Sequence, residues 1–405
     1  MKPFQRKWAA FVLVGVVVFL RMPVGQAQDS REALISSAQE QKSKNLQPEV
    51  QDRVELFIQN MVNGGWFFSP TPRGLYPYIE SVYPSGGLAL GLGYRKFFGD
   101  YSFAELRGLY SFANDKRFEF RVVSPNHAGG RLDFDATAGW MNATQIPYYG
   151  LGSTTTRDNE TNFQLQQAYY KGGVTIRPIR WFHVRAASGY ENIVEEDGTG
   201  DTPTVSDKFD STTAPGLGVS PAYVHSEAAA ALVWAPAEGY ARRGGDLRYT
   251  YHFYNNTSGN LDNFQLSRAE FVEHIPFLRE TWVLSLRARL EGVHGSDSGV
   301  PYYLLPWLGD SSTLRGYGTA RFRDRHAMLY SAEWRWIPNR FAMDMALFAD
   351  AGMVAPRFAD LKFTKLKYDY GVGVRFHGPA VTALRIDVAH SDEGFHLVFS
   401  TSAPF

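Results

Sequence analysis

Apolar and polar residues alternate with a period of two along the C-terminal third of the chain, and this pattern constrains the fold more than any other feature. Between residues 368 and 376 the aromatic and aliphatic side chains share one parity, whereas Asp369, Arg375 and two glycines share the other. Residues 282–291 and 384–390 repeat the pattern, with every arginine, aspartate and glutamate on one parity. Because successive side chains of a strand point to opposite faces, each segment is predicted to form a strand with one apolar and one polar face.

Segments of this kind recur along the chain and predict an all-β fold of sixteen antiparallel strands. The expected strands are 74–83, 86–97, 100–112, 116–124, 130–143, 161–177, 180–193, 221–235, 244–256, 262–274, 280–294, 326–337, 342–353, 367–377, 381–390 and 395–403. An even number suits a closed transmembrane β-barrel with both chain ends on one side, in which no strand edge is left unpaired in lipid. The connections vary between short turns and long loops, of which 194–220 and 295–325 are prominent, as in barrels of this type.

The alternation by itself fits two architectures, since a soluble β-sandwich differs from a membrane barrel only in which face is exposed. Three features favour the membrane barrel. Aromatic residues make up 15% of the chain, cysteine is absent so that disulfides are excluded, and the last residue is Phe405. Tyrosine and tryptophan are favoured at membrane interfaces. The formal net charge is zero and no basic run stands out, so nothing indicates a nucleic-acid partner.

The N-terminal part of the chain differs from the predicted barrel. Residues 1–27 are expected to be a secretory signal peptide, because basic residues precede an apolar run and a small-residue cleavage site ends at Ala27. The apolar run is shorter than the roughly twenty residues that a spanning helix needs. Residues 28–65 combine a polar stretch with helically spaced apolar residues, which predicts either a short periplasmic or lumen-plugging helix or a loosely ordered tether. The barrel is expected to occupy residues 66–405.

The connection 295–325 is too long for an ordinary hairpin and contains a run of distinctive residues. That run is Leu314, Arg315, Gly316 and Tyr317. Strand parity places Glu333, Asp344 and Asp350 on the polar, lumen-facing side of the two strands that follow the loop. If the loop folds inward, Arg315 reaches these carboxylates, and its planar guanidinium suits paired carboxylates better than a lysine would. Gly316 would permit the close backbone approach that such a loop demands.

Five short motifs follow one another in the last hundred residues: 309–317, 332–335, 348–352, 371–376 and 384–387, before the terminal Phe405. In this order they resemble the BamA/TamA superfamily of outer-membrane barrels, the bacterial surface antigen domain. The resemblance covers residues 300–405 most clearly and implies a sixteen-stranded barrel whose sixth external loop returns into the lumen. It implies that Arg315 pairs there with Glu333 and Asp350, and that Phe405 belongs to the assembly signal.

The resemblance also implies a function in the bacterial outer membrane, namely assistance in the insertion or translocation of proteins, or of lipids. The route would be a local opening of the seam between the first and last strands. The expected partners are outer-membrane lipid, an unfolded membrane-protein client and a separately encoded periplasmic protein. Members with this role generally carry POTRA domains, and residues 28–65 are too few for one, so we expect a short member without them. Pro404 cannot donate a ladder hydrogen bond, which predicts a weakly paired seam.

The sequence also bears on two other classes of function, a passive pore and an enzyme. A passive pore or small-solute channel is suggested by lumen charges, namely Arg287, Arg289, Arg375 and Arg385. An enzyme is disfavoured, because His390, Ser391 and Asp392 are consecutive on a strand and cannot form a triad among themselves. The sequence holds no nucleophile elbow, no metalloprotease motif and no histidine pair at metal-ligand spacing. No cofactor or metal ion is therefore expected.

Overall fold

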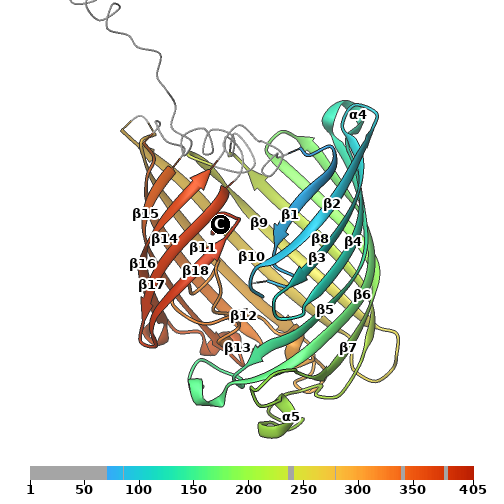
Figure 1. Cartoon of the computed structure of the whole chain (residues 1–405), viewed down its shortest axis with the longest axis vertical. Helices are drawn as coiled ribbons and strands as arrows, with labels where there is room; N and C mark the ends of the chain where they lie inside the picture. The colour runs from blue at the N-terminus through green and yellow to red at the C-terminus, as the bar shows by residue number, and fades with distance from the viewer. Residues whose placement is uncertain (1–70, 85, 236–240, 279, 339–342, 378–381) are drawn as a thin grey trace, which may run out of the picture. The chain divides into compact units, whose positions relative to one another are not determined.

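The computed structural model describes residues 71–405 apart from 85, 236–240, 279, 339–342 and 378–381. The expected signal peptide and the segment 28–65 lie outside the described residues. Sixteen antiparallel strands form a single sheet that curls into a nearly closed barrel (Figure 1). Each strand of the sheet pairs with its neighbour in sequence, except where β14 follows β11 across the long loop. The prediction of an all-β, sixteen-stranded antiparallel barrel is confirmed.

The strands of the barrel wall are β1 Gly74–Glu80, β2 Ala89–Phe98, β3 Ser102–Ser111, β4 Lys116–Asn126, β5 Leu132–Tyr148, β6 Thr161–Ile179, β7 Phe182–Asp197, β8 Ala222–Val233, β9 Gly244–Asn256, β10 Phe264–Phe277, β11 Trp282–His294, β14 His326–Trp336, β15 Met343–Ala355, β16 Lys367–His377, β17 Thr382–Ser391 and β18 Gly394–Ser400. A separate pair, β12 Trp307–Leu308 and β13 Phe322–Arg323, lies within the long loop.

Helical structure among the described residues is limited to short turns in the connections. These are α4 His127–Gly130, η1 Arg157–Asn159, α5 Val205–Lys208, η2 Tyr302–Leu304, η3 Phe358–Asp360 and η4 Phe363–Lys365. The part of the chain that the structure describes contains no helix long and apolar enough to cross a membrane.

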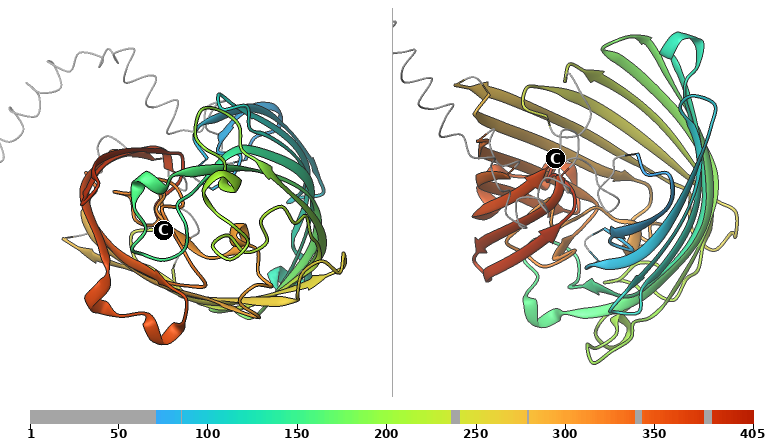
Figure 2. Two further views of the ribbon diagram at one scale, coloured as in Figure 1. Left: turned by 90° about the horizontal axis from the view of Figure 1, so that it is seen from below. Right: turned by 45° about the horizontal axis from the view of Figure 1, so that its top comes forward.

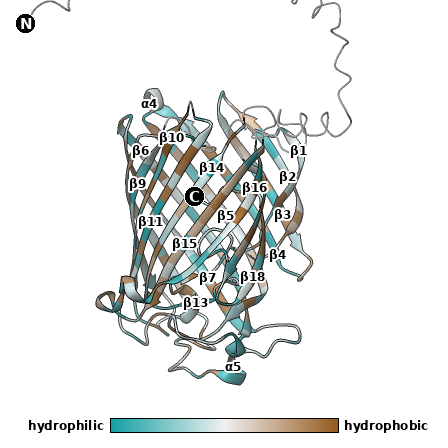
Figure 3. Ribbon diagram, turned by 90° about the vertical axis from the view of Figure 1, so that its left-hand side faces the viewer, coloured by the Kyte–Doolittle hydropathy of each residue, from teal (hydrophilic) through white to brown (hydrophobic). Residues whose placement is uncertain are grey.

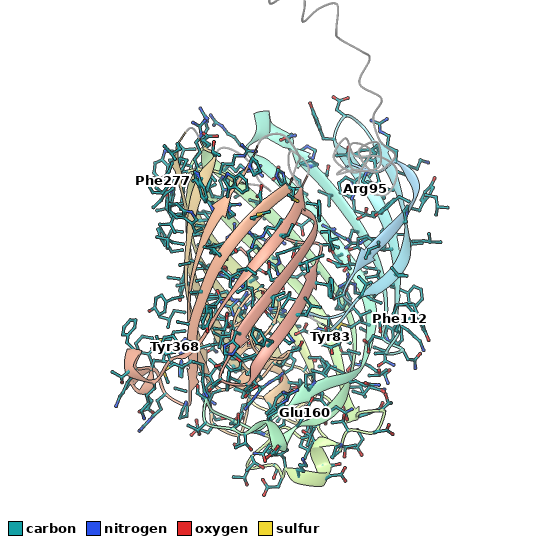
Figure 4. All side chains as sticks on the ribbon, turned by 60° about the vertical axis from the view of Figure 1, so that its left-hand side comes forward. Tyr83, Arg95, Phe112, Glu160, Phe277 and Tyr368 are labelled. Atoms are coloured by element: carbon teal, nitrogen blue, oxygen red, sulfur yellow. The ribbon has the colours of Figure 1, made fainter. Side chains whose placement is uncertain are left out.

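The apolar parity of the strands faces outward and the polar parity faces the lumen. Leu347 and Tyr370 are 60% and 62% exposed, whereas Asp350 and Asp369, on the same two strands, are each 2% exposed. Hydrophobic and hydrophilic positions therefore alternate along each strand (Figure 3). Phe112, Phe277 and Tyr368 project from the outer surface (Figure 4). A soluble sandwich would bury its apolar parity, so that alternative is wrong.

Strand boundaries agree with the predicted ones to within a few residues at most ends, and two differences bear on the site. β5 continues past the expected residue 143 to Tyr148, through an irregularity between Ala143 and Ile146. β18 ends at Ser400 rather than 403, because the last residues turn inward and the C-terminus lies inside the barrel (Figure 2). There the Pro404 carbonyl accepts a hydrogen bond from Arg287 Nη1 at 3.3 Å.

The first and last strands form the seam of the barrel. Among the described residues, β1 pairs only with β2 and β18 pairs only with β17. The two strands face each other across the seam without a ladder between them (Figure 2). β1 has 7 residues and β2 has 10, whereas β5 has 17 and β6 has 19. β17 and β18 have 10 and 7 residues, so both sides of the seam are made of short strands.

Candidate functional site

Residues 295–325, which we call the inserted loop, fold back into the lumen and pack against its wall. Leu308, Leu314, Tyr317 and Phe322 are buried together with wall residues of β14 and β15. Nearer the external end, Tyr302 and Tyr303 of the loop pack among buried aromatic residues of the wall. Arg323 donates a hydrogen bond to the Tyr302 carbonyl at 2.8 Å, which ties the two halves of the loop together. The loop is thus held by its own apolar residues as well as by polar contacts.

Arg315 lies at the tip of the inserted loop and is 1% exposed. Its Nε is 2.7 Å from Asp350 Oδ2 and its Nη2 is 3.2 Å from Asp350 Oδ1, which makes a bidentate pair. Nη1 lies 3.0 Å from Glu333 Oε2 and 3.4 Å from Asp387 Oδ2. The guanidinium also stacks 3.5 Å from the centre of the Phe348 ring. We call Arg315, Glu333, Asp350 and Asp387 the Arg315 cluster.

The carboxylates of the cluster come from three strands of the wall, so the cluster joins the loop to β14, β15 and β17. The sequence named Arg315, Glu333 and Asp350, and the structure brings these three together. Asp387 and Phe348 were not named as site residues. Strand parity already placed Asp387 on the lumen face, but which lumen residues meet the loop depends on the stagger between strands, which parity does not give.

Three wall arginines extend the network around the cluster. Arg375 Nη2 lies 2.5 Å from Glu333 Oε2, and Arg385 Nε lies 3.3 Å from Asp387 Oδ2. Arg385 also donates to the Ser311 carbonyl, and Arg287 donates to the Ser312 carbonyl at 2.7 Å. These arginines were expected to be lumen charges that a solute would meet. Instead they bind buried carboxylates and the backbone of the inserted loop.

Gly316 and Tyr317 fasten the tip of the loop to the last strands of the barrel. A Cβ atom at Gly316 would lie 2.6 Å from the Cβ of Asp369 and 3.0 Å from that of Ser391, so only glycine fits. The Gly316 carbonyl accepts a hydrogen bond from Ser391 Oγ at 2.8 Å, and the Tyr317 hydroxyl donates to Asp392 Oδ1 at 2.7 Å. His396 of β18 contacts the Arg315 carbonyl at 2.9 Å. The loop therefore supports the strand that borders the seam.

Consecutive residues His390, Ser391 and Asp392 have separate structural contacts. His390 packs edge-to-face against Phe395 with ring centres 4.7 Å apart, and Ser391 donates a hydrogen bond to the Gly316 carbonyl. Asp392 accepts hydrogen bonds from the Tyr317 hydroxyl and from Lys367 at 2.8 Å. Within the described ranges, no group of three or more histidine, aspartate or glutamate side chains is arranged to hold a metal ion.

Asp369 is a buried carboxylate that faces Asp350 directly across the β15–β16 pair. Its carboxylate interacts with the Gly316 backbone N–H and with the Asp350 carboxylate. We expect Asp369→Asn to leave the barrel unchanged or to stabilise it by about 1 kcal/mol, because it removes a like charge beside Asp350. Asp350→Asn should destabilise by roughly 3 kcal/mol, because it weakens the bidentate partner of Arg315. The midpoint temperature of the heat-dependent gel shift measures the stability of both variants. Equal decreases of this temperature in Asp369→Asn and Asp350→Asn would contradict this account.

Asp324 is a buried acid of the inserted loop, outside the barrel wall, and it gives the fold a pH dependence. Burial raises the pKa of Asp324 to about 6, above its ordinary value of 3.8, even though the Arg325 backbone N–H donates to Oδ1 at 2.8 Å. Because the folded state holds the proton more tightly than the unfolded state, this stabilising contribution is complete below about pH 4. It is lost as the pH rises through about 6.

We therefore expect the midpoint temperature of the gel shift to fall between pH 5 and pH 8 by more in the parent protein than in Asp324→Asn. This difference between the two proteins corresponds to roughly 1–3 kcal/mol in the free energy of unfolding, because each unit of pKa shift contributes about 1.4 kcal/mol. Other titrating groups are common to both proteins and cancel in the comparison. Identical pH profiles for the two proteins would rule out Asp324 as the source.

Comparison with known proteins agrees with the fold. Residues 238–402 match the Omp85 superfamily domain. No curated protein matches the chain. Among solved structures, BamA from Haemophilus ducreyi lacking POTRA domains 1–3 is similar with a TM-score of 0.58 and 13% identity, over 80% of this chain and 69% of that chain. CdiB from Acinetobacter baumannii is matched with a TM-score of 0.49 and 10% identity, over 81% of this chain and 56% of that chain. The domain match over residues 238–402 and the sixteen-stranded fold support the predicted resemblance to BamA/TamA-like barrels.

Proposed function

We propose that this chain resides in the outer membrane of a bacterium and assists the insertion or translocation of proteins there. The observation that carries the proposal is the unpaired seam between β1 and β18. In the hydrocarbon core a backbone N–H or C=O without a partner costs several kcal/mol, so spanning barrels normally close completely. An open pair of edges in this wall is therefore a place where another strand can add.

The inserted loop fits this role by supporting one side of the seam. It is anchored in the lumen by the Arg315 cluster and it contacts β18 through His396. We propose that the cluster keeps the loop and the last strands in position while the seam admits a client. No covalent chemistry is needed, because the work is the pairing of backbone groups at the two edges.

A passive pore is the alternative function, and the contents of the lumen weigh against it. The inserted loop crosses the lumen, and the C-terminus lies inside the barrel as well (Figure 2). The terminal Phe405 ring lies parallel to the His274 ring at 6.5 Å, and the Arg287 guanidinium lies 5.8 Å from its centre. Of the arginines that suggested a solute path, Arg287 and Arg385 bind the backbone of this internal structure, whereas Arg289 and Arg375 pair with carboxylates of the wall.

The test uses the full chain in phosphatidylcholine vesicles and a small urea-unfolded outer-membrane barrel as the client. We expect the client to reach its heat-modifiable folded form several-fold faster than in empty vesicles. In planar bilayers the same preparation should give small, erratic currents. Large steady currents without any acceleration of client folding would contradict the proposal and favour the pore. A separately encoded periplasmic partner, if the system uses one, should co-purify with the chain after cross-linking.

A further inference from the structure

A groove lies at the end of the barrel opposite the long loops, between the turn after β4 and the turn after β6. Its volume is about 670 Å³, and the residues that line it include Arg131, Arg177, Arg180, Trp181 and His183. We call it the rim groove. The turn with α4 and the loop with α5 lie at opposite ends of the wall (Figure 1). Short turns of outer-membrane barrels face the periplasm, so the rim groove lies at the level of the periplasmic leaflet.

The rim groove carries more positive than negative charge. Its acidic neighbour Asp133 is already bound by Arg177 and accepts a hydrogen bond from the Asn126 backbone N–H at 3.0 Å. Arg131 and Arg180 are exposed, and neither forms an ion pair with any described residue. The groove therefore presents two guanidinium groups whose charge the protein does not balance. Guanidinium groups bind phosphate oxygens with paired, charge-assisted hydrogen bonds.

The outer wall beside the rim groove is apolar. Phe134 of β5 and Ile176 of β6 share the outward parity and are 46% and 42% exposed. Ile179 and Trp181 border the groove itself and are also exposed. Tryptophan is favoured at the boundary between acyl chains and headgroups. A positively charged groove beside an apolar outer wall is complementary to a molecule with an anionic headgroup and hydrocarbon tails.

We propose that the rim groove binds the phosphate of an anionic phospholipid from the periplasmic leaflet. Arg131 and Arg180 would contact the phosphate, and Trp181 would lie against the upper part of the acyl chains. The ligand class follows from the two unbalanced arginines, since a zwitterionic headgroup leaves part of their charge unneutralised. Such a lipid would fix the depth and orientation of the barrel in the membrane. It would do so at the end of the barrel opposite the inserted loop.

Native mass spectrometry of the full chain tests the proposal. The protein is released from vesicles that hold equal amounts of phosphatidylglycerol and phosphatidylcholine with the same acyl chains. We expect the parent protein to retain a phosphatidylglycerol molecule in preference to phosphatidylcholine. The double variant Arg131→Ala, Arg180→Ala should lose about tenfold to thirtyfold of that preference, since each arginine near an anionic headgroup contributes about tenfold or less.

The matched control is Arg243→Ala, in another turn at the same end of the barrel. Arg243 is 64% exposed, like the groove arginines, but it lies 3.8 Å from Glu280. The Arg243→Ala variant should retain the parent's preference for phosphatidylglycerol. The heat-dependent gel shift confirms that every variant is folded. The proposal is overturned if the parent protein does not prefer phosphatidylglycerol to phosphatidylcholine. It is also overturned if the double variant keeps the parent's preference, because the two arginines would then serve another partner, such as an acidic protein. Displacement of the lipid by millimolar inorganic phosphate would assign the groove to a free anion instead, and would also overturn it.

Discussion

Replacing Arg315 by alanine is expected to destabilise the barrel by about 3–5 kcal/mol, the cost of leaving buried carboxylates without their cation. Glu333, Asp350 and Asp387 all lie within 3.4 Å of the guanidinium, and each is 2% exposed or less. Arg375 and Arg385 contact Glu333 and Asp387, but no other arginine pairs with Asp350 among the described residues. The loop would also lose the stacking of Arg315 on Phe348.

The measurement is the midpoint temperature of the gel shift, together with the yield of folded barrel in the outer membrane. Arg315→Lys should recover part of the loss, because a lysine supplies the charge but not the two parallel hydrogen bonds to Asp350. The matched control is Arg248→Ala, which removes an arginine that is 55% exposed and 3.6 Å from Asp246. Loss of this solvent-exposed ion pair should lower the free energy of unfolding by about 1 kcal/mol or less. An Arg315→Ala barrel as stable as the control would contradict the described role of the cluster.

A second set of measurements separates bracing from a direct role in client handling. If the Arg315 cluster only holds the barrel wall together, Arg315→Lys protein that has folded should accelerate client folding as well as the parent does. If the cluster also positions β18 at the seam, that variant should be slower even at temperatures where it is fully folded. His396→Ala removes the contact between β18 and the Arg315 carbonyl and should then have the same effect.

The wall of the barrel could be predicted from the sequence because a strand's period of two is a local property. The alternation around Tyr370 and Leu284 identifies individual strands without knowledge of their partners. The same parity identified Glu333 and Asp350 as lumen residues. The identity of the membrane-facing side needed more than parity, since the exposed fractions of residues such as Leu347 decide it.

The rest of the site depends on long-range geometry that a single sequence does not encode locally. Asp387 joins the Arg315 cluster from β17. Predicting this contact requires knowledge of the stagger between four neighbouring strands, β14 to β17. The inward turn after Ser400 was missed because 395–403 keeps a strand-like pattern almost to its end. Pro404 was the available signal, since proline cannot continue a ladder, and its carbonyl instead meets Arg287 in the lumen. The rim groove likewise forms only when two separate turns come together.

Linking the two edges of the seam covalently is expected to abolish acceleration of client folding. The chain contains no cysteine, so the double variant Ile79→Cys, Leu397→Cys has only the two introduced thiols. Ile79 shares the outward parity of Leu75 in β1, and Leu397 is an exposed residue of β18. A reducible bis-maleimide would connect these strands and prevent a client strand from entering between them. We expect a loss of more than tenfold in the rate, because strand addition needs both edges free.

The control places the same linker where it cannot affect the seam. In Ile79→Cys, Leu90→Cys the two cysteines lie on β1 and β2, which are already paired at these positions. Linking them leaves the β1 edge that faces β18 unpaired. This variant should accelerate client folding at the parent's rate, and any loss in it would reveal damage from the chemistry itself.

The rate of client folding in vesicles, before and after reduction of the β1–β18 linker, tests the central claim most directly. The seam account predicts that the linked barrel is inactive, that reduction restores the parent's rate, and that the β1–β2 linker has no effect in either state. A linked barrel that folds the client as fast as the reduced one would contradict the account, because the client would then not pass between β1 and β18.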